Sequence, residues 1–189
     1  MVLALPRGGV PVGFEVARAL GAPLDLLMVG KISAPGFPEL AVGAVVGGAV
    51  PRTVLNDDVL RELAVPAHYV ERTAARELAE IERRRALYCV GRPPVPLDGR
   101  TAIVVDDGVA TGATVRVALQ ALAASGTARR VVLAVPVAPR EVAATLDTLC
   151  DEVVILLRPS VLGTVGRFYD DFRQTKDAEV IALLDLATR

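Results

Sequence analysis

The chain has 189 residues, which is enough for one domain with a sizeable hydrophobic core and short for two. Hydrophobic residues make up 52% of it, which excludes an intrinsically disordered chain, and a formal net charge of −1 gives no basis for binding nucleic acid or an anionic membrane surface. Cys89 and Cys150 belong to no cluster with metal-ligand spacing, and no apolar run approaches the length of a membrane span. We therefore expect one cytoplasmic domain of residues 1–189, with neither nucleic acid nor membrane as a partner.

Aromatic residues make up only 4% of the chain and there is no Trp, so Val, Leu, Ile and Ala must form the core. This composition is typical of a parallel sheet covered by helices. In the first half of the chain, Pro and Gly mark loops between apolar runs and helical patterns. In chain order this half predicts a strand at Val2–Leu5, a helix that ends before Gly21, a strand at Leu24–Val29, a loop at Ser33–Pro38, a β-hairpin of Val42–Val46 with Ala49–Leu55, and a long amphipathic helix at Pro66–Tyr88.

The second half of the chain repeats the alternation of strands and helices more clearly. Alternating strands and helices indicate an α/β fold with a doubly wound, mostly parallel sheet, to which the hairpin is an appendage. Ligands of such folds bind at the carboxyl ends of the strands, which here means after Leu5, Val29 and Val105. This half predicts strands at Ala102–Val105, Arg130–Val135 and Val153–Leu157, and helices at Ala113–Ala124, Glu141–Leu149 and Asp177–Ala187, with Asp177 as a candidate cap.

Residues 104–115 read VVDDGVATGATV. Asp106 and Asp107 follow a buried strand, although adjacent like charges repel and a buried carboxylate without a partner is costly. Gly112, Ala113 and Thr114 begin a helix, whose free backbone N–H groups and dipole favour a phosphate. The glycine spacing and the lack of a following Lys exclude a nucleoside-triphosphate P-loop. One phosphate site beside two acceptors suits a ribose 5-phosphate, and the alternative is a capped helix start with the aspartates in a turn.

The same residues resemble the 5-phosphoribosyl diphosphate (PRPP) motif of the type I phosphoribosyltransferases, in which hydrophobic residues precede an acidic pair and a T-G-x-T turn. The resemblance implies that Asp106 and Asp107 are the catalytic residues and bind the ribose hydroxyls. It also implies that the segment after them wraps the 5-phosphate of the ribose. That segment consists of Gly108, Val109, Ala110, Thr111, Gly112, Ala113 and Thr114.

Residues 5–9, LPRGG, stand where this family has its pyrophosphate loop. Arg7 would supply charge-assisted donors, and Gly8 and Gly9 would expose backbone amides at the start of the next helix. Lys31, at the end of the second strand, would also lie near the pyrophosphate. This order of segments most resembles the adenine-type branch, although Gly30 stands where a second basic residue is expected. The alternatives are an ordinary tight turn for the loop and a surface position for the lysine.

Members of this family also have a flexible loop that closes over PRPP and a variable hood that recognises the base. The Pro35–Leu55 region is the candidate loop, with Glu39 as a candidate acid or base, but a structural hairpin with a surface glutamate is the favoured alternative. Residues 165–172 hold three of the chain's seven Phe and Tyr residues, and Phe168 and Tyr169 are the candidates for stacking on the base. The alternative is a small satellite core under the C-terminal helix.

Together these segments predict a phosphoribosyltransferase that displaces pyrophosphate from PRPP with a nitrogen nucleophile of a small-molecule base. Mg²⁺ is the expected cofactor, held by ligand oxygens and, through water, by Asp106 and Asp107. Ala110 stands where hypoxanthine-type members often carry an aspartate, which disfavours a 6-oxopurine enzyme of that pattern. The rival interpretation is a non-catalytic PRPP- or nucleotide-sensing module, because the chain starts directly on its first core strand and no catalytic acid is assigned. The apolar stripe of the Pro66–Tyr88 helix is a candidate surface for a homo-oligomer.

Overall fold

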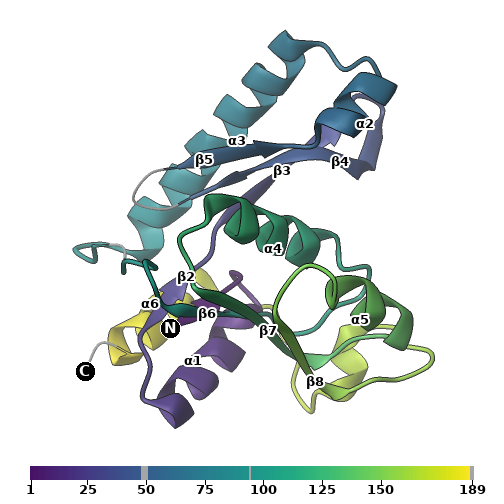
Figure 1. The fold of residues 1–189 in the computed structure, drawn as a ribbon. Coiled ribbons are helices and arrows are strands. Elements are labelled where there is room, and N and C mark those ends of the chain that lie inside the picture. The colour runs from purple at the N-terminus through teal and green to yellow at the C-terminus, as the bar shows by residue number, and fades with distance from the viewer. Residues whose placement is uncertain (48–50, 94, 188–189) are drawn as a thin grey trace.

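A five-stranded parallel sheet forms the body of the molecule (Figure 1). The computed structural model describes residues 1–47, 51–93 and 95–187. All four strand pairs in this sheet are parallel, and the strand order β2-β1-β6-β7-β8 places the first strand of the chain beside one from its second half. The mostly parallel α/β fold predicted from the sequence is therefore confirmed. The strands are β1 (Val2–Ala4), β2 (Leu24–Leu26), β6 (Thr101–Val105), β7 (Arg130–Val137) and β8 (Glu152–Leu157).

Helices cover both faces of this sheet, as the alternation of buried side chains requires. On one face Val2 and Ala4 pack with α1 (Gly9–Leu20) and α6 (Asp177–Ala187). On the other face Leu3 and Leu5 pack in the core that includes α4 (Ala113–Ser125) and α5 (Arg140–Leu146). The sheet is thus doubly wound, and its carboxyl edge carries the loops after β1 and β6.

A second, antiparallel sheet forms a smaller lobe, seen above α4 in Figure 1. It has the order β3-β4-β5 and lies between two helices, because its strands contact α3 on one side and α4 on the other. A short helix follows β5. The elements of this lobe are β3 (Val29–Ala34), β4 (Phe37–Val46), β5 (Arg52–Leu55), α2 (Asp57–Glu62) and α3 (Ala67–Tyr88).

Several predicted boundaries are wrong, and most of them lie in this lobe. The strand predicted at Leu24–Val29 is two elements, because β2 ends at Leu26 and β3 begins in the other sheet at Val29. The loop predicted at Ser33–Pro38 is a tight hairpin, in which only Pro35 and Gly36 separate β3 from β4. Gly36 has a φ of 78°, which suits a turn, and Pro38 lies outside the part of β4 that pairs with the described residues of β5.

The predicted hairpin of Val42–Val46 with Ala49–Leu55 is confirmed where the strands are described, since β4 pairs with β5 from Arg52 to Leu55. Its turn, residues 48–50, lies outside the described residues. The appendage is larger than predicted, because β3 adds a third strand and the sequence reading missed α2. In the body, α5 spans Arg140–Leu146 instead of the predicted Glu141–Leu149.

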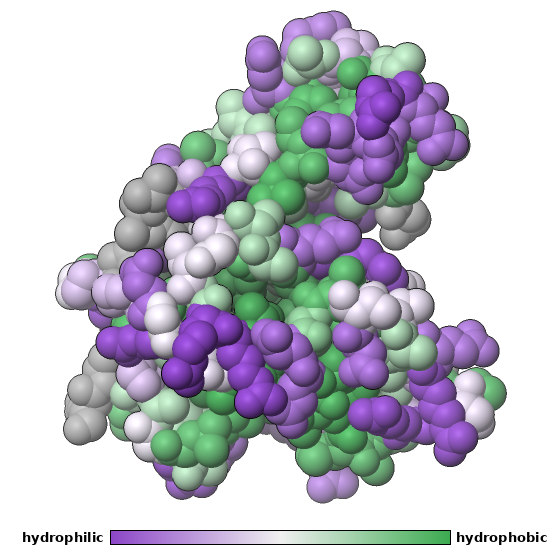
Figure 2. Space-filling view, viewed as in Figure 1, coloured by the Kyte–Doolittle hydropathy of each residue, from purple (hydrophilic) through white to green (hydrophobic). Residues whose placement is uncertain are grey.

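The surface supports the division into a lobe and a body. Figure 2 shows hydrophilic residues gathered over the end of the lobe that carries α2, and the surface is hollowed between this end and the body. Within residues 1–47, 51–93 and 95–187, every helix is too short or too polar to cross a bilayer.

Candidate active site

The carboxylate pair lies at the carboxyl edge of the parallel sheet, directly after β6. Both side chains are half-buried, and Oδ1 of Asp106 accepts a hydrogen bond from the backbone N–H of Asp107 at 2.9 Å. Burial, followed by the charge of Asp107, raises the pKa of Asp106 to about 7, and burial also raises the pKa of Asp107. Neither carboxylate has a side-chain ion pair among the described residues. The pair therefore suits a ligand that brings hydroxyl donors or a cation.

The loop after this pair leads into α4. Gly112 occupies the N-cap position with a φ of 78°, and no side chain there caps the helix. Thr111 accepts only a long hydrogen bond, 3.4 Å, from the N–H of Ala113, and the Thr111 and Thr114 side chains are exposed. Two exposed threonines thus flank a helix start that has only one weak side-chain cap, and this arrangement suits an anion better than a capped helix start.

The loop of residues 6–9 packs directly against the carboxylates. A Cβ on Gly8 would overlap the carboxylate of Asp107, coming within 2.7 Å of its Cγ. A Cβ on Gly9 would lie 2.7 Å from the carbonyl oxygen of Val105. The peptide bond between Pro6 and Arg7 is cis. The structure therefore brings the predicted pyrophosphate loop and the predicted ribose residues together, and glycine is what allows this approach.

Arg7 has a partner that the sequence reading did not identify. Its Nη1 lies 3.3 Å from Oδ1 of Asp177, the first residue of α6. The hydroxyl of Tyr88, the last residue of α3, donates to the same oxygen at 2.6 Å. The sequence marked Asp177 only as a candidate helix cap, and no local pattern connects it with a loop 170 residues earlier.

Lys31 lies on β3, on the face opposite to α3. Gly30 contacts α3, since a Cβ on it would lie 2.6 Å from Cβ of Glu77, and successive side chains of a strand alternate between faces. This close approach also explains why a glycine stands where a second basic residue was expected. A small cavity of about 70 Å³ brings Pro6, Gly30 and Thr114 to one place, so three predicted segments line a common space.

The hood candidates lie over the PRPP motif. The hydroxyl of Tyr169 donates to the backbone carbonyl of Asp107 at 2.5 Å, and Val165 packs so closely on Gly108 that a Cβ there would lie 2.6 Å from its Cγ1. Burial, with smaller contributions from both aspartates, raises the pKa of Tyr169 to about 12, so the hydroxyl remains a donor at neutral pH. Its ring lies 5.1 Å from that of Phe172, and Phe168 beside it is 36% exposed.

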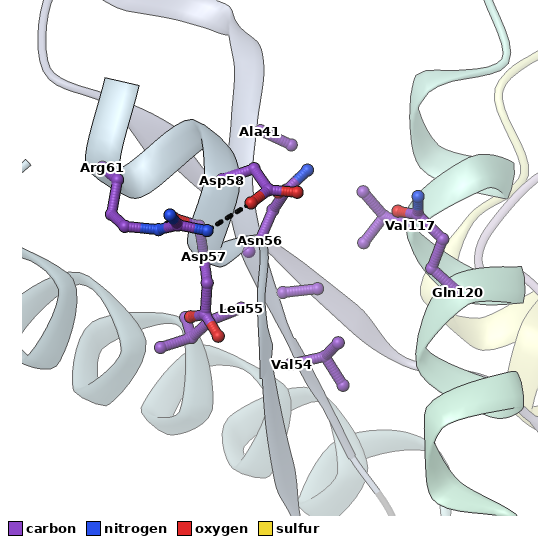
Figure 3. A pocket seen from close by; sticks show the side chains of 11 residues that line it. Ala41, Val54, Leu55, Asn56, Asp57, Asp58, Arg61, Val117 and Gln120 are labelled. Carbon is purple, nitrogen blue, oxygen red and sulfur yellow. Dashed lines mark hydrogen bonds and ion pairs between the residues drawn. The ribbon is translucent and has the colours of Figure 1, made fainter. Parts of the chain in front are cut away.

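In the described residues, the candidate flexible loop Pro35–Leu55 consists mainly of the paired strands β4 and β5, as the favoured alternative of a structural hairpin predicted. The side chain of Glu39 lies outside the described residues, so its predicted role stays a prediction. A cavity of about 490 Å³ is lined by β4, β5 and α2 of the antiparallel lobe and by α4, and Figure 3 shows Asp58 paired with Arg61 on one side of it and Gln120 of α4 on the other. None of the predicted site residues lines this cavity.

The described residues contain no group of three or more His, Cys, Asp and Glu side chains able to hold a metal ion. Mg²⁺ usually takes one or two carboxylates and fills its remaining positions with water and phosphate oxygens. Asp106 and Asp107, which lack a cationic partner among the described side chains, fit that limited role.

Comparison with known proteins agrees with this geometry. Residues 1–165 match the family described as phosphoribosyl transferase domain. The chain belongs to this family. A protein of Mycobacterium tuberculosis, provisionally named a phosphoribosyl transferase, is 48% identical over 189 residues, and the chain spans 42% of that relative's length. The bifunctional protein PyrR of Brevibacillus brevis is 31% identical over 112 residues, which are 54% of this chain and 63% of PyrR.

A solved structure confirms the fold. The crystal structure of TT1426 from Thermus thermophilus superposes with a TM-score of 0.86 at 44% sequence identity. The match covers 97% of this chain and 85% of that one, so the lobe and the C-terminal helix are included in it along with the parallel sheet.

Proposed function

We propose that this site transfers the 5-phosphoribosyl group of PRPP to a nitrogen of a small-molecule base and releases pyrophosphate. The observation that carries the proposal is the direct packing of the residue 6–9 loop on Asp107, beside the uncapped start of α4. One substrate with a 5-phosphate, a ribose and a pyrophosphate matches these three neighbouring segments in that order. Membership of the phosphoribosyl transferase family supports this class of reaction.

In the proposed complex, the amides at the start of α4 and the hydroxyls of Thr111 and Thr114 hold the 5-phosphate. Asp106 and Asp107 accept hydrogen bonds from the ribose 2- and 3-hydroxyls. A carboxylate with a pKa near 7 is partly protonated at neutral pH, and bound hydroxyl donors favour its charged form. The two carboxylates then stabilise the positive charge that develops at the anomeric carbon.

Arg7, Lys31 and the amides of Gly8 and Gly9 hold the pyrophosphate in this proposal. The base nitrogen bonds to the anomeric carbon, the bond from that carbon to the pyrophosphate oxygen breaks, and the bond electrons leave with pyrophosphate. The proton lost by the base passes to the released pyrophosphate or to solvent. Mg²⁺, when bound, neutralises charge on the leaving pyrophosphate. Tyr169 fixes the loop that carries Asp107, and the exposed ring of Phe168 offers a stacking face for the base.

The test is a screen for pyrophosphate release with PRPP, Mg²⁺ and a panel of purine and pyrimidine bases. We expect release with at least one base, and a large loss of both PRPP affinity and release in Asp107→Asn. The matched control is Asp98→Asn, which removes one exposed carboxylate near the opposite edge of the sheet. Saturable PRPP binding without pyrophosphate release on any base would contradict the enzymatic function and favour the non-catalytic PRPP-sensing module. Unchanged PRPP affinity in Asp107→Asn would overturn the site itself.

A further inference from the structure

The C-terminal helix lies outside the segment that matches the family, which ends at residue 165. Its first residue nevertheless contacts the loop to which we assign pyrophosphate. Oδ1 of Asp177 lies 3.3 Å from Nη1 of Arg7, and the two side chains are 36% and 47% exposed for Arg7 and Asp177 respectively. The contact thus joins the loop after β1 to a helix that begins 170 residues later in the chain.

Asp177 is held in place from two sides. Tyr88, only 5% exposed, donates its hydroxyl to Oδ1 of Asp177 at 2.6 Å. The helix that Asp177 begins is itself docked, since Val180 and Leu184 are buried at 0% and 2% exposure. The hydrogen bond from Tyr88, and then the contact with Arg7, lower the pKa of Asp177, which keeps it charged at neutral pH. Arg7 thus meets a carboxylate whose position is fixed by the core.

Arg7 has donors left for a ligand. A guanidinium carries five N–H groups, and within the described residues Asp177 accepts from one of its nitrogens only. A free arginine side chain loses rotamer freedom when it binds an anion, whereas a side chain that is already restrained loses less. A fixed carboxylate at one end of the guanidinium can therefore favour binding at the other.

We propose that Asp177, anchored by Tyr88, is a positioning residue that orders Arg7 for the pyrophosphate of the ligand. This inference rests on the proposed function. A carboxylate also repels an incoming anion, but Asp177 is half-exposed and already paired, so solvent and salt weaken that repulsion. The gain from ordering Arg7 therefore exceeds the repulsion, so Asp177 raises the affinity for pyrophosphate. Loss of Asp177 weakens the binding of ligands that carry a pyrophosphate.

The decisive variant is Asp177→Asn, which keeps an acceptor for Tyr88 and removes the charge that pairs with Arg7. Calorimetry with Mg²⁺ measures the affinity for PRPP, for inorganic pyrophosphate and for ribose 5-phosphate. We expect the affinity for the two ligands that contain pyrophosphate to fall about twofold to tenfold. This range corresponds to the free-energy cost of ordering one long side chain. We expect no change for ribose 5-phosphate, which a general loss of folding would not spare.

The matched control is Asp185→Asn. Asp185 lies on the same helix and pairs with Arg92 at 2.7 Å, so this variant removes the same charge away from the loop. We expect it to leave all three affinities unchanged. In an Arg7→Met background, Asp177→Asn should cause no further loss, because its effect passes through Arg7. Unchanged or tighter pyrophosphate binding in Asp177→Asn, an equal loss for ribose 5-phosphate, or full additivity with Arg7→Met would each overturn the proposal.

A second measurement needs no ligand and separates this inference from the proposed function. If the native chain binds no PRPP, the proposed function fails, but the order of the Arg7 side chain can still be followed through its Nε–H signal in NMR relaxation. We expect that signal to become more mobile in Asp177→Asn and in Tyr88→Phe, and to stay unchanged in Asp185→Asn. Equal order in all four proteins would show that Asp177 does not position Arg7.

Discussion

The two halves of the candidate site are built in different ways. The half assigned to ribose 5-phosphate is one continuous segment, residues 106–114, which runs from the end of β6 into the first turn of α4. The half assigned to pyrophosphate combines Arg7 and Lys31 from different elements. Arg7 pairs with Asp177 of α6, and Asp177 in turn accepts a hydrogen bond from Tyr88 of α3. One half thus depends mainly on local backbone geometry, and the other depends on tertiary packing.

This difference has consequences for mutation. In the continuous half, the proposed ligand contacts are backbone amides and a carboxylate pair, so a single substitution would change a group that contacts the ligand directly. In the assembled half, side chains that are far apart in sequence each supply part of the proposed pyrophosphate contacts. Single substitutions there should have smaller effects and should act only on ligands that contain pyrophosphate. Four substitutions test this contrast, from the largest expected effect to the smallest.

Gly8→Ala acts where the two halves meet. The added Cβ would overlap the carboxylate of Asp107, so either the loop or the aspartate must move. Overpacking of this kind costs about 1–3 kcal/mol, and we expect a loss of about 10- to 100-fold in PRPP affinity, measured by calorimetry.

Gly126→Ala is the control for this substitution. Gly126 ends α4 with a φ of 62°, and a Cβ there would meet no atom within 4 Å. It should lower the stability of the fold by about 1 kcal/mol and leave PRPP affinity unchanged. Native-like PRPP binding in Gly8→Ala would show that the loop and Asp107 do not act on one ligand.

Asp106→Asn should raise the stability of the unliganded protein at neutral pH. Because the pKa of Asp106 rises from 3.8 to about 7 on folding, the native state binds the proton more tightly than the unfolded state. The carboxyl therefore costs stability increasingly as the pH rises from about 4 to about 7, and Asn removes this cost. We expect a gain of about 1–3 kcal/mol at pH 8 that shrinks at pH 5, measured by denaturant unfolding.

The same variant should bind PRPP more weakly, because an amide is a poorer partner for the ribose hydroxyls and a cation. Asp98→Asn again controls for the loss of one negative charge. A stability difference between Asp106→Asn and the native chain that is equal at pH 5 and pH 8 would contradict the raised pKa.

The contrast between the halves also explains what the sequence could predict. The alternation of apolar runs and helices predicted the parallel sheet, and the bounds of the Asp177–Ala187 helix are confirmed without change. The sequence could assign a role to residues 106–114 because strand end, turn and helix start are neighbours in the chain, and that role stays a prediction. The position of this segment beside Gly8 followed from the rule that parallel strands end at one edge.

Other features depend on contacts that no local pattern records. The antiparallel lobe was misread at Ser33–Pro38, because two prolines and a glycine suit a tight hairpin turn as well as a loop. A glycine stands at position 30 instead of the expected basic residue because α3 packs closely on it. The sequence pattern of α3 does not indicate that this helix contacts Gly30. Tyr169 was chosen for its ring, whereas its hydroxyl makes the contact with Asp107. Arg7 and Asp177 could be paired only by the fold.

Tyr169→Phe should reduce both stability and ligand affinity. It removes a half-buried hydrogen bond to the carbonyl of Asp107, which contributes about 0.5–1.5 kcal/mol to the free energy of unfolding. Because that bond fixes the loop of the carboxylate pair, affinity for PRPP and for ribose 5-phosphate should fall together by a few-fold. Tyr69→Phe is the matched control: it removes a hydroxyl that donates to the carbonyl of Ser33 at 3.2 Å, away from the carboxylates. An equal effect of the two variants on ligand affinity would show that the hood residue Tyr169 does not contribute to the site.

Lys31→Met should have the smallest effect, and its selectivity is the sharpest test of the contrast. The side chain is half-exposed on β3, on the face opposite to α3, and a single screened contact with pyrophosphate contributes less than about 1 kcal/mol. We expect PRPP affinity to fall about twofold to fivefold, more at low salt than at high salt, with no change for ribose 5-phosphate. Arg129→Met removes one exposed positive charge just before β7, at the opposite edge of the sheet, and should change neither affinity. If Lys31→Met weakened ribose 5-phosphate as much as PRPP, Lys31 would act on the 5-phosphate at the start of α4, and the division of the site into two halves would fail at this residue.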